Sequence, residues 1–249
     1  MASPFLTAEW RKLVLINYVI DAHHLVPYIP YGTVLDTYND TCYVSVVGFM
    51  FLDSKIKGIP IPFHQDFEEV NFRFYVKRQT KNGAWRRGVV FIKEFVPKVM
   101  VSAIAKYVYK ENYETLEMDH TWKERKETIE VEYTLTSLDD TGKDKQYFMG
   151  VTADKNAIEI PVACEAEFIT EHYWGYTRIE SHKTTEYEVW HPRWKTYPVQ
   201  EFSCNFDFKA LYGEEFAFMN ALKPFSVMLA EGSEVKLMEG ETIQEEGSA

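Results

Sequence analysis

Residues 68–95 have the sequence EEVNFRFYVKRQTKNGAWRRGVVFIKEF and form the centre of the stretch 47–110 that decides the fold. Two runs rich in Val, Phe and Tyr, which favour strands, flank the turn Lys81-Asn82-Gly83. The Asn-Gly pair supplies the positive φ angles that a tight hairpin turn needs. We therefore expect an antiparallel hairpin, with one strand over Glu68–Val76 and the other over Trp85–Phe95.

The first strand of this hairpin has two different faces, because successive side chains point to opposite sides of a strand. The apolar face carries Val70, Phe72 and Phe74, and the polar face carries Glu69, Asn71, Arg73 and Tyr75. In a half-exposed antiparallel sheet the polar face meets water, and its ion pairs contribute little. In a closed barrel the same face lines the interior and would form a ligand site, which Arg87 or Glu94 on the neighbouring strand would join. The sequence leaves both alternatives open.

Composition and charge narrow the class of protein. The chain has 249 residues and no linker rich in Pro, Gly or Ser, so we expect one domain over residues 1–249. A hydrophobic content of 46% is ample for a large core. The net charge of −11 repels nucleic-acid phosphates and anionic lipids, so neither a nucleic acid nor a membrane is an expected partner. No apolar run approaches about 20 residues and no signal peptide is evident, which favours the cytoplasm.

No motif indicates a metal or a cofactor. The cysteines Cys42, Cys164 and Cys204 are far apart, which disfavours a disulfide framework and a zinc site. His23 and His24 are adjacent, so on a helix they would point apart. The sequence also lacks a glycine loop that cradles phosphate and a nucleophile elbow. We therefore expect neither a metal nor a cofactor.

Strands dominate the rest of the chain. They are expected over Leu13–Ile20, Val34–Tyr38, Cys42–Phe49, Tyr113–Lys123, Thr128–Leu138, Tyr176–Glu180, Thr184–Trp190, Val199–Phe208, Val227–Ala230 and Val235–Met238. A polar loop is expected over Asp139–Ala157, and a loosely held acidic tail from about residue 239. The pattern predicts an α+β fold, with a largely antiparallel sheet that is curved or closed into a barrel or cone.

Helices are expected at three places. Asp21 would cap a short helix that ends before Pro27, and Ala163–Tyr173 has helical spacing. A further helix follows Pro97, a favourable residue in a first helical turn. In this helix a core-facing stripe contains Val101, Ile104, Ala105 and Val108, and a solvent-facing stripe contains Lys98, Ser102, Lys106 and Lys110.

Several motifs together resemble one family. They are Val47-Gly48-Phe49, Gly58–His64, Glu68–Arg73, Arg87–Phe91, Phe168–Tyr173, Trp190–Trp194 and Ser226–Ser233. These motifs are similar to those of the YqjF-like family of bacterial proteins, the domain of unknown function numbered 2071. The resemblance covers most of the chain and implies a bacterial origin without an established activity.

That family is in turn distantly similar in fold to acetoacetate decarboxylase, in which a Pro-Lys-Lys triplet follows a strand. There the first lysine forms a Schiff base, and the second lowers its pKa. Pro97 and Lys98 match the first two positions, whereas Val99 stands at the third. The resemblance thus implies Lys98 as the nucleophile of a decarboxylase- or aldolase-like lyase. The departure at Val99 argues against this role, since a lysine at its ordinary pKa is protonated at pH 7 and is not nucleophilic.

Histidines and aromatic residues supply further candidates for a ligand site. His64 lies in the loop after Pro62-Phe63 and would orient a ligand or act as a base, unless it is an ordinary hydrogen-bonded loop residue. Two pairs, His172 with Tyr173 and His191 with Trp194, offer aromatic rings with polar tips. These pairs would line a pocket or pack at its rim.

Three functions are compatible with these features. The first is a protein that binds a small organic molecule of unknown identity in an aromatic-lined cavity. The second is an enzyme that uses Lys98 as a Schiff-base nucleophile. The third is an interaction module that binds a protein partner through an exposed strand edge or aromatic patch. Assembly into a homo-oligomer stays open in all three.

Overall fold

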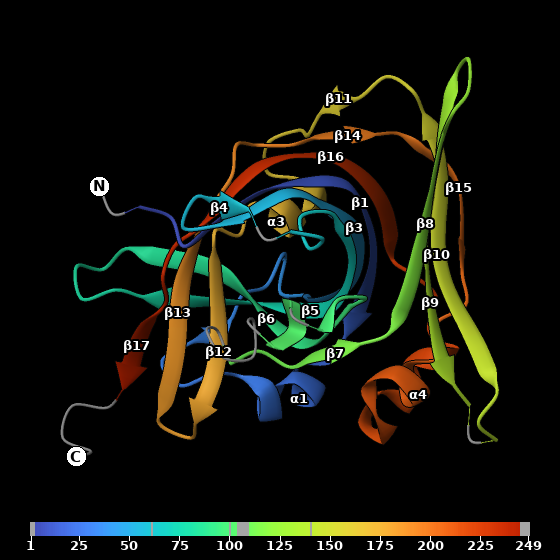
Figure 1. Cartoon of the computed structure of the whole chain (residues 1–249). Coiled ribbons are helices and arrows are strands. Elements are labelled where there is room, and N and C mark those ends of the chain that lie inside the picture. The colour runs from blue at the N-terminus through green and yellow to red at the C-terminus, as the bar shows by residue number, and fades with distance from the viewer. Residues whose placement is uncertain (1–2, 61, 100, 104–109, 140, 245–249) are drawn as a thin grey trace.

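The computed structural model describes residues 3–60, 62–99, 101–103, 110–139 and 141–244, which form two sheets and several short helices (Figure 1). The larger sheet contains β1 (Leu6–Ile20), β2 (Val34–Leu35), β3 (Cys42–Ile56), β4 (Ile59–Pro60), β5 (Phe67–Gln79), β6 (Trp85–Val96), β7 (Tyr113–Thr115), β11 (Ile158–Glu159), β12 (Trp174–Glu180), β13 (Lys183–Trp190), β14 (Lys195–Tyr197), β16 (Ser226–Leu237) and β17 (Glu241–Gln244). The smaller sheet contains β8 (Glu117–Glu124), β9 (Thr128–Leu138), β10 (Asp144–Asp154) and β15 (Val199–Cys204). The helical elements are α1 (Ala22–Leu25), η1 (Val26–Tyr28), α3 (Glu165–Thr170), α4 (Phe208–Tyr212) and η2 (Glu214–Ala221).

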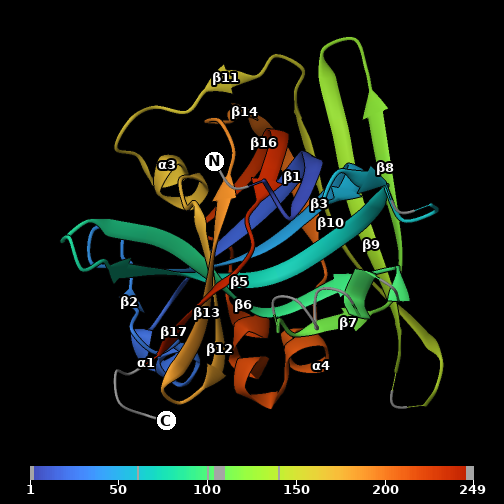
Figure 2. The same cartoon turned by 60° about the vertical axis from the view of Figure 1, so that its left-hand side comes forward.

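The larger sheet curves until strands from its two sides meet. Its central strands follow the order β16-β1-β3-β5-β6-β12-β13, and β13 pairs again with β16 at Val189–Leu237 and Trp190–Lys236. The pairing is antiparallel except where β6 meets β7 and β12. Figures 1 and 2 show this sheet wrapped on itself, with the smaller sheet standing beside it. The prediction of an α+β fold with a curved, mostly antiparallel sheet is confirmed, although the short β13–β16 contact does not make a regular barrel.

β5 and β6 form the predicted hairpin, but its turn differs from the expected two-residue turn. Gly83 has a φ of 86°, whereas Asn82 is not among the residues with positive φ. The Gly83 amide donates to the Thr80 carbonyl at 2.9 Å, and the Thr80 amide donates to the Ala84 carbonyl at 2.8 Å. The loop therefore has three residues, and the glycine at its end adopts the left-handed conformation that such loops need.

Replacing Gly83 with alanine is expected to lower the free energy of unfolding by about 1 kcal/mol, because a Cβ disfavours a left-handed φ by roughly this amount. No described atom lies within 4 Å of the position that the Cβ would occupy, so a clash adds nothing. Urea unfolding measures the loss. Gly83→Asn should lose less, since asparagine tolerates this conformation. Equal losses in the two variants would contradict the argument.

The apolar face of β5 packs into the core between the two sheets. Val70, Phe72 and Phe74 are fully buried there, together with residues of β9, β10, α4 and η2. The ring of Phe72 lies 4.7 Å from that of Tyr212 and 5.1 Å from that of Phe216, measured between centroids. Because the apolar face of β5 packs into this core, its polar face must point to the other side of the larger sheet.

The polar face of β5 points to the enclosed side of the curved sheet. Glu69, Asn71 and Arg73 are 3%, 2% and 8% exposed, so they are not on a solvated surface. A second core on this side contains the rings of Phe49, Tyr75 and Trp194. The sequence left open whether this polar face meets water or lines the interior of the sheet. In the structure it lines the interior.

The prediction of a polar loop over Asp139–Ala157 is wrong. Most of this segment is β10, which pairs with β9 from Asp144–Leu138 to Asp154–Thr128. Tyr147, Met149, Val151 and Ala153 alternate along it and are buried in the core between the sheets. The polar run at the start of the strand conceals this alternation, because residues 144–146 are exposed there.

Two expectations for the C-terminal part are also wrong. The two short strands expected over Val227–Ala230 and Val235–Met238 are the single strand β16, which keeps one register with β1 from Leu6–Leu237 to Asn17–Ser226 although Gly232 has a φ of 78°. The loose tail expected from about 239 includes β17, which pairs with β13 through four residue pairs. Residues 245–249 lie outside the described residues.

Three other segments differ in extent. The strand expected over Tyr113–Lys123 is split, since β7 pairs with β6 and β8 pairs with β9. The helix expected over Ala163–Tyr173 is the shorter α3, and the strand expected over Val199–Phe208 ends at Cys204. α4 and η2 lie where the sequence pattern predicts no element beyond residue 208. These short elements have few turns over which a periodic pattern could appear.

The predicted start of α1 is confirmed, because the Asp21 side chain accepts a hydrogen bond from the His23 amide at 3.0 Å. After Pro97, residues 99 and 101–103 are helical, and Ile104, Ala105, Lys106 and Val108 lie outside the described residues. Ser102 is buried, so the expected solvent-facing stripe is wrong at this position. Within the described residues, no helix has the length and apolar character needed to cross a membrane.

Candidate functional site

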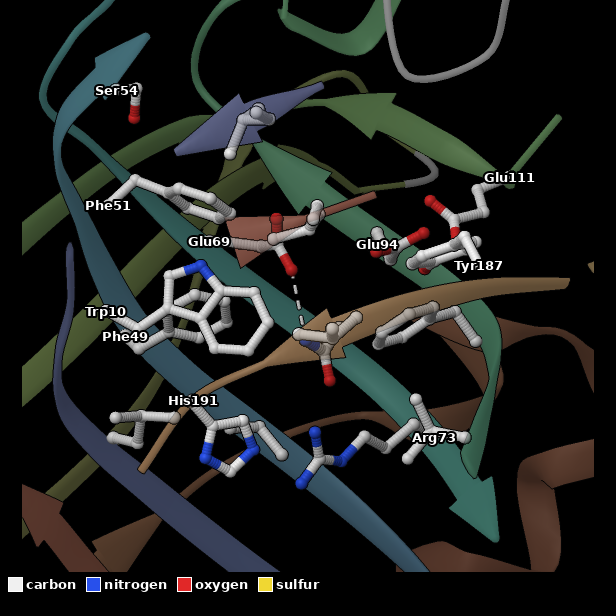
Figure 3. Close-up of a pocket in the computed structure, with 18 of the residues that line it drawn as sticks. Trp10, Phe49, Phe51, Ser54, Glu69, Arg73, Glu94, Glu111, Tyr187 and His191 are labelled. Carbon is white, nitrogen blue, oxygen red and sulfur yellow. Dashed lines mark hydrogen bonds between the residues drawn. The ribbon is translucent and has the colours of Figure 1, made fainter. Parts of the chain in front are cut away.

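The curved sheet encloses a cavity of about 100 Å³ on the side to which the polar face of β5 points. A single water needs about 10–15 Å³ of such volume, so the cavity can hold a small organic molecule. Its lining comes mainly from β1, β3, β5, β6 and β13, with residues from the loops that connect them. Figure 3 shows side chains from these strands converging on the same space.

Aromatic rings form much of the wall. Trp10 of β1 packs edge-on against Phe49 and Phe51 of β3, with centroid distances of 5.3 and 5.7 Å. Trp194 continues this wall 6.4 Å from Trp10. The alternation of β1 and β3 places these rings on one face of the sheet, and Tyr187 of β13 faces them from another strand (Figure 3). The wall therefore offers an apolar surface to a ligand.

A row of polar side chains crosses the apolar wall. Asn71 of β5 lies opposite Glu94 of β6, and Glu94 lies opposite Tyr113 of β7. The Asn71 amide donates to Glu69 Oε1 at 3.0 Å, and the Tyr113 hydroxyl donates to Glu69 Oε2 at 3.2 Å. Glu111 also lines the cavity, where its carboxylate accepts a hydrogen bond from Tyr187. Figure 3 shows Glu94, Glu111 and Tyr187 gathered at one side of the cavity.

Burial raises the pKa of all three carboxyl groups. Desolvation raises the pKa of Glu69 to about 7 and that of Glu111 to about 8. Desolvation and the neighbouring charges of Glu111 and Glu69 raise the pKa of Glu94 well above its usual range. Near pH 7 this group therefore contains protonated carboxyls, which can donate hydrogen bonds as well as accept them.

Arg73 is the one lysine or arginine among the described residues that line the cavity. Figure 3 shows its guanidinium pointing toward His191, on the side of the cavity away from Glu111. Burial lowers the pKa of His191 and also lowers the pKa of His172 to about 4. Both rings are therefore neutral at pH 7, and Arg73 supplies the positive charge on this side of the cavity.

The family can be assigned from the whole chain. A family model named DUF2071, described as an uncharacterized conserved protein, matches residues 7–234. This chain belongs to the DUF2071 family. The resemblance seen in the sequence motifs is thereby confirmed. A comparison with curated proteins gives no match.

Solved structures share the fold of this DUF2071 protein. An acetoacetate decarboxylase from Legionella pneumophila has a TM-score of 0.62 at 14% identity, with 97% of this chain and 88% of that chain covered. An acetoacetate decarboxylase-like enzyme from Sphingomonas wittichii RW1 has a TM-score of 0.59 at 13% identity, with 98% and 94% covered. The enduracididine biosynthesis enzyme MppR, complexed with pyruvate, has a TM-score of 0.60 at 11% identity, with 97% and 91% covered. At such low identity these likenesses show the fold alone.

Most of the site residues that the sequence suggested for this DUF2071 protein meet at the cavity. The lining includes Glu69, Asn71, Arg73, Glu94, His64, His172, His191 and Trp194. Arg87 lies elsewhere and donates from Nε to Asp36 Oδ2 at 2.6 Å. Tyr173 packs its ring 4.7 Å from His191 and donates from its hydroxyl to Glu171. These two residues support lining residues without lining the cavity themselves.

Lys98 does not line the cavity, although Val101 in the following helical turn does. Lys98 is half-buried, and its carbonyl accepts a hydrogen bond from the Ser102 amide at 3.1 Å. The lysine that the decarboxylase resemblance singles out is therefore not among the described residues around the cavity of this DUF2071 protein.

Several cavity residues of this DUF2071 protein escaped the sequence analysis. They are Trp10, Ser54, Glu111, Tyr113, Thr170, Trp174 and Tyr187. Trp10 could have been found from the sequence, because it is a large apolar residue that shares a strand face with Ala8. Glu111 and Tyr187 had no local signal, because they meet only when β7 pairs with β6 and β12 pairs with both β6 and β13.

One group outside the cavity has the composition of a metal site. Ligand atoms of Glu68, Asp119 and His120 lie within 4.8 Å of one another, and His120 Nδ1 is 2.6 Å from Glu68 Oε1. Asp119 is exposed and the other two are half-buried. A histidine–carboxylate pair at a strand edge accounts for this geometry, so we assign no ion to it.

Proposed function

We propose that this protein binds a small organic acid in the cavity of the curved sheet. One observation carries the proposal. Of the eight buried side-chain polar atoms without a hydrogen-bond partner in the described residues, six belong to the cavity lining: Trp10 Nε1, Ser54 Oγ, Asn71 Oδ1, Arg73 Nε, Glu94 Oε2 and His172 Nδ1. Buried polar groups without partners are costly, so their concentration around one cavity supports a polar ligand there.

The charges of the lining favour an acid over a base. Arg73 is the cationic side chain of the described lining, and its Nε is among the atoms without a partner. Guanidinium groups bind carboxylates with good geometry and resist losing their charge. The carboxyl groups of Glu94 and Glu111 have raised pKa values because they are buried, so at pH 7 they repel an anion less than ionised carboxylates would. The aromatic wall would contact the apolar part of the molecule.

The structural neighbours are consistent with this class of ligand. MppR was solved in complex with pyruvate, a short keto acid. Two other neighbours are named as acetoacetate decarboxylase or as an enzyme like it.

Short organic acids are therefore expected to stabilise the protein. The panel is lactate, pyruvate, phenyllactate and phenylpyruvate, with acetamide and cyclohexylamine as neutral and cationic controls. Saturating acid should raise the Tm by at least about 2 °C, because a ligand that binds the native state shifts the unfolding equilibrium. Calorimetric titration gives the Kd. Stabilisation by the amine and by none of the acids would overturn the proposal.

The same panel tests the alternative of a Schiff-base enzyme. Sodium borohydride is added with each keto acid, and the protein is mapped by peptide mass spectrometry. Because Lys98 is not among the described lining residues, binding without trapping at Lys98 is the expected result. A reduced adduct on Lys98 would replace the binding proposal by lysine catalysis.

A further inference from the structure

His172 and Asp36 form a buried pair at the edge of the cavity. His172 Nε2 lies 3.2 Å from Asp36 Oδ2, and the two side chains are 1% and 5% exposed. Arg87 Nε also contacts Asp36 Oδ2 at 2.6 Å, and Lys77 Nζ contacts Asp36 Oδ1 at 3.0 Å. Asp36 was not suggested by the sequence, because it lies in a short extended segment without a motif.

This arrangement fixes which nitrogen of His172 carries the proton. Burial alone would raise the pKa of Asp36, but its hydrogen bonds with His172 and Arg87 and the charge of Arg87 hold it far below its usual value. Asp36 is therefore ionised and can only accept hydrogen bonds. Since burial keeps the His172 ring neutral at pH 7, its single proton must be on Nε2, facing Asp36.

Nδ1 of His172 is consequently a hydrogen-bond acceptor without a donor. It is buried and has no partner among the described residues, and its ring lines the cavity. Asn71 provides a second acceptor of this kind, because its amide nitrogen already donates to Glu69 and its Oδ1 has no partner in the described part of the chain. The cavity thus presents unmatched acceptors in addition to the unmatched donors of Arg73 and Trp10.

Arg73 and His172 lie around the same aromatic ring. The Arg73 guanidinium carbon is 5.7 Å from the centroid of Tyr75, and the His172 ring is 4.7 Å from it. The hydroxyl of Tyr75 is held by Ser45 at 2.6 Å, so this ring is a fixed support. A short acid whose carboxylate is bound by Arg73 would therefore present its neighbouring substituent to His172.

We infer that the cavity selects acids with a hydrogen-bond donor beside the carboxylate, as in 2-hydroxy acids, and that the pair Asp36–His172 is the selecting element. This inference rests on the proposed function. A 2-hydroxyl group donates to His172 Nδ1, whereas a 2-keto oxygen is an acceptor and leaves Nδ1 unpaired. Sites that require a hydrogen-bonding group discriminate against analogues that lack it, because their own buried polar atoms then lose a partner.

The test compares lactate with pyruvate, and phenyllactate with phenylpyruvate, by calorimetric titration at pH 7.5. In the wild type the hydroxy acid of a pair should bind about tenfold more tightly than the keto acid, as the loss of one buried hydrogen bond implies. In His172→Phe the ratio should fall to about one, because the hydroxyl group of the ligand loses its acceptor. The matched control His120→Phe, outside the cavity, should keep the wild-type ratio.

A ratio within one protein is insensitive to a partial loss of folded material, so it separates selection from structural damage. Long-range ¹H–¹⁵N spectra of the imidazole add a direct readout, with the proton of His172 expected on Nε2 and none on Nδ1. Equal binding of both members of each pair would overturn the inference and leave the proposed function standing. A preference that persists in His172→Phe, or a proton found on Nδ1, would also overturn it. Failure of all four acids to bind would overturn the proposed function itself.

Discussion

Replacing Arg73 with methionine is expected to weaken binding of the hydroxy acid about 100-fold. Arg73 is the positive charge of the described lining and is 8% exposed. Removing one partner of a desolvated charge pair typically costs about 2–5 kcal/mol, and each 1.4 kcal/mol is a factor of ten in Kd. The loss should appear as a higher Kd with unchanged stoichiometry in calorimetric titrations.

The same substitution should leave the unliganded protein folded and no less stable. Arg73 is buried and its Nε has no hydrogen-bond partner within the residues that the structure describes, so the native state bears the cost of its desolvation. Methionine removes this cost and fills much of the same volume. Thermal unfolding without ligand should therefore give a Tm equal to or above that of the wild type.

Two further variants define the role of Arg73. Arg73→Lys keeps the charge but loses the planar donor geometry, so it should recover part of the affinity. Arg125→Met removes an exposed arginine from the turn between β8 and β9, outside the described lining, and should change neither Kd nor Tm appreciably. An unchanged Kd in Arg73→Met, or tighter binding, would refute an acid held by this guanidinium.

The sequence predicts the fold of this chain where the information is local. The hairpin of β5 and β6 is evident from two aliphatic and aromatic runs around a glycine turn, and the alternation of β5 separates Val70 and Phe72 from Glu69 and Arg73. The sequence pattern does not predict β10, because exposed polar residues at its start mask the alternation of its buried half. The parallel pairs of β6 are not predictable, since neither β7 nor β12 has a local signal for its partner.

The sequence likewise predicts only the part of the site that depends on local pattern. Alternation shows that Glu69, Asn71 and Arg73 share a face, but whether that face meets water depends on the contact between β13 and β16. That contact joins residues 189–190 to residues 236–237, and no short-range pattern specifies it. Asp36 and Glu111 reach their partners His172 and Tyr187 across similarly long separations. Local rules thus identify the polar row, and the topology supplies the groups that complete it.

The free energy of unfolding is expected to fall by at least about 1 kcal/mol as the pH rises from 7 to 9, because a carboxyl group with a folded-state pKa of about 8 still loses its proton over this range. The carboxyl groups of Glu94 and Glu111 are fully buried, and desolvation raises the pKa of both, that of Glu111 to about 8. In the unfolded chain both ionise near pH 4.5, so between that pH and the folded-state pKa the native state binds more protons. Stability contributed by such groups is complete at low pH and is lost as the pH rises through the folded pKa.

Other groups around these carboxyls do not reverse the sign in this window. Burial raises the pKa of Tyr113 well above its usual value, so this hydroxyl does not titrate here. His172 and His191 have lowered pKa values because they are buried, and they are neutral in both states above about pH 7. Histidine titration therefore affects the stability below this window and does not account for a loss between pH 7 and 9.

Glu94→Gln tests this directly, because glutamine keeps the shape of the side chain and cannot ionise. Urea unfolding at pH 6, 7, 8 and 9 should show a flatter dependence in the variant, which should be more stable than the wild type at pH 9. Glu124→Gln, an exposed control on β8 that pairs with Lys155, should keep the wild-type slope. A wild-type stability that is constant from pH 7 to 9, or an equal slope in Glu94→Gln, would mean that these carboxyls are already ionised in the folded protein. The cavity would then repel an anion, and a cationic ligand would have to replace the acid proposed for it.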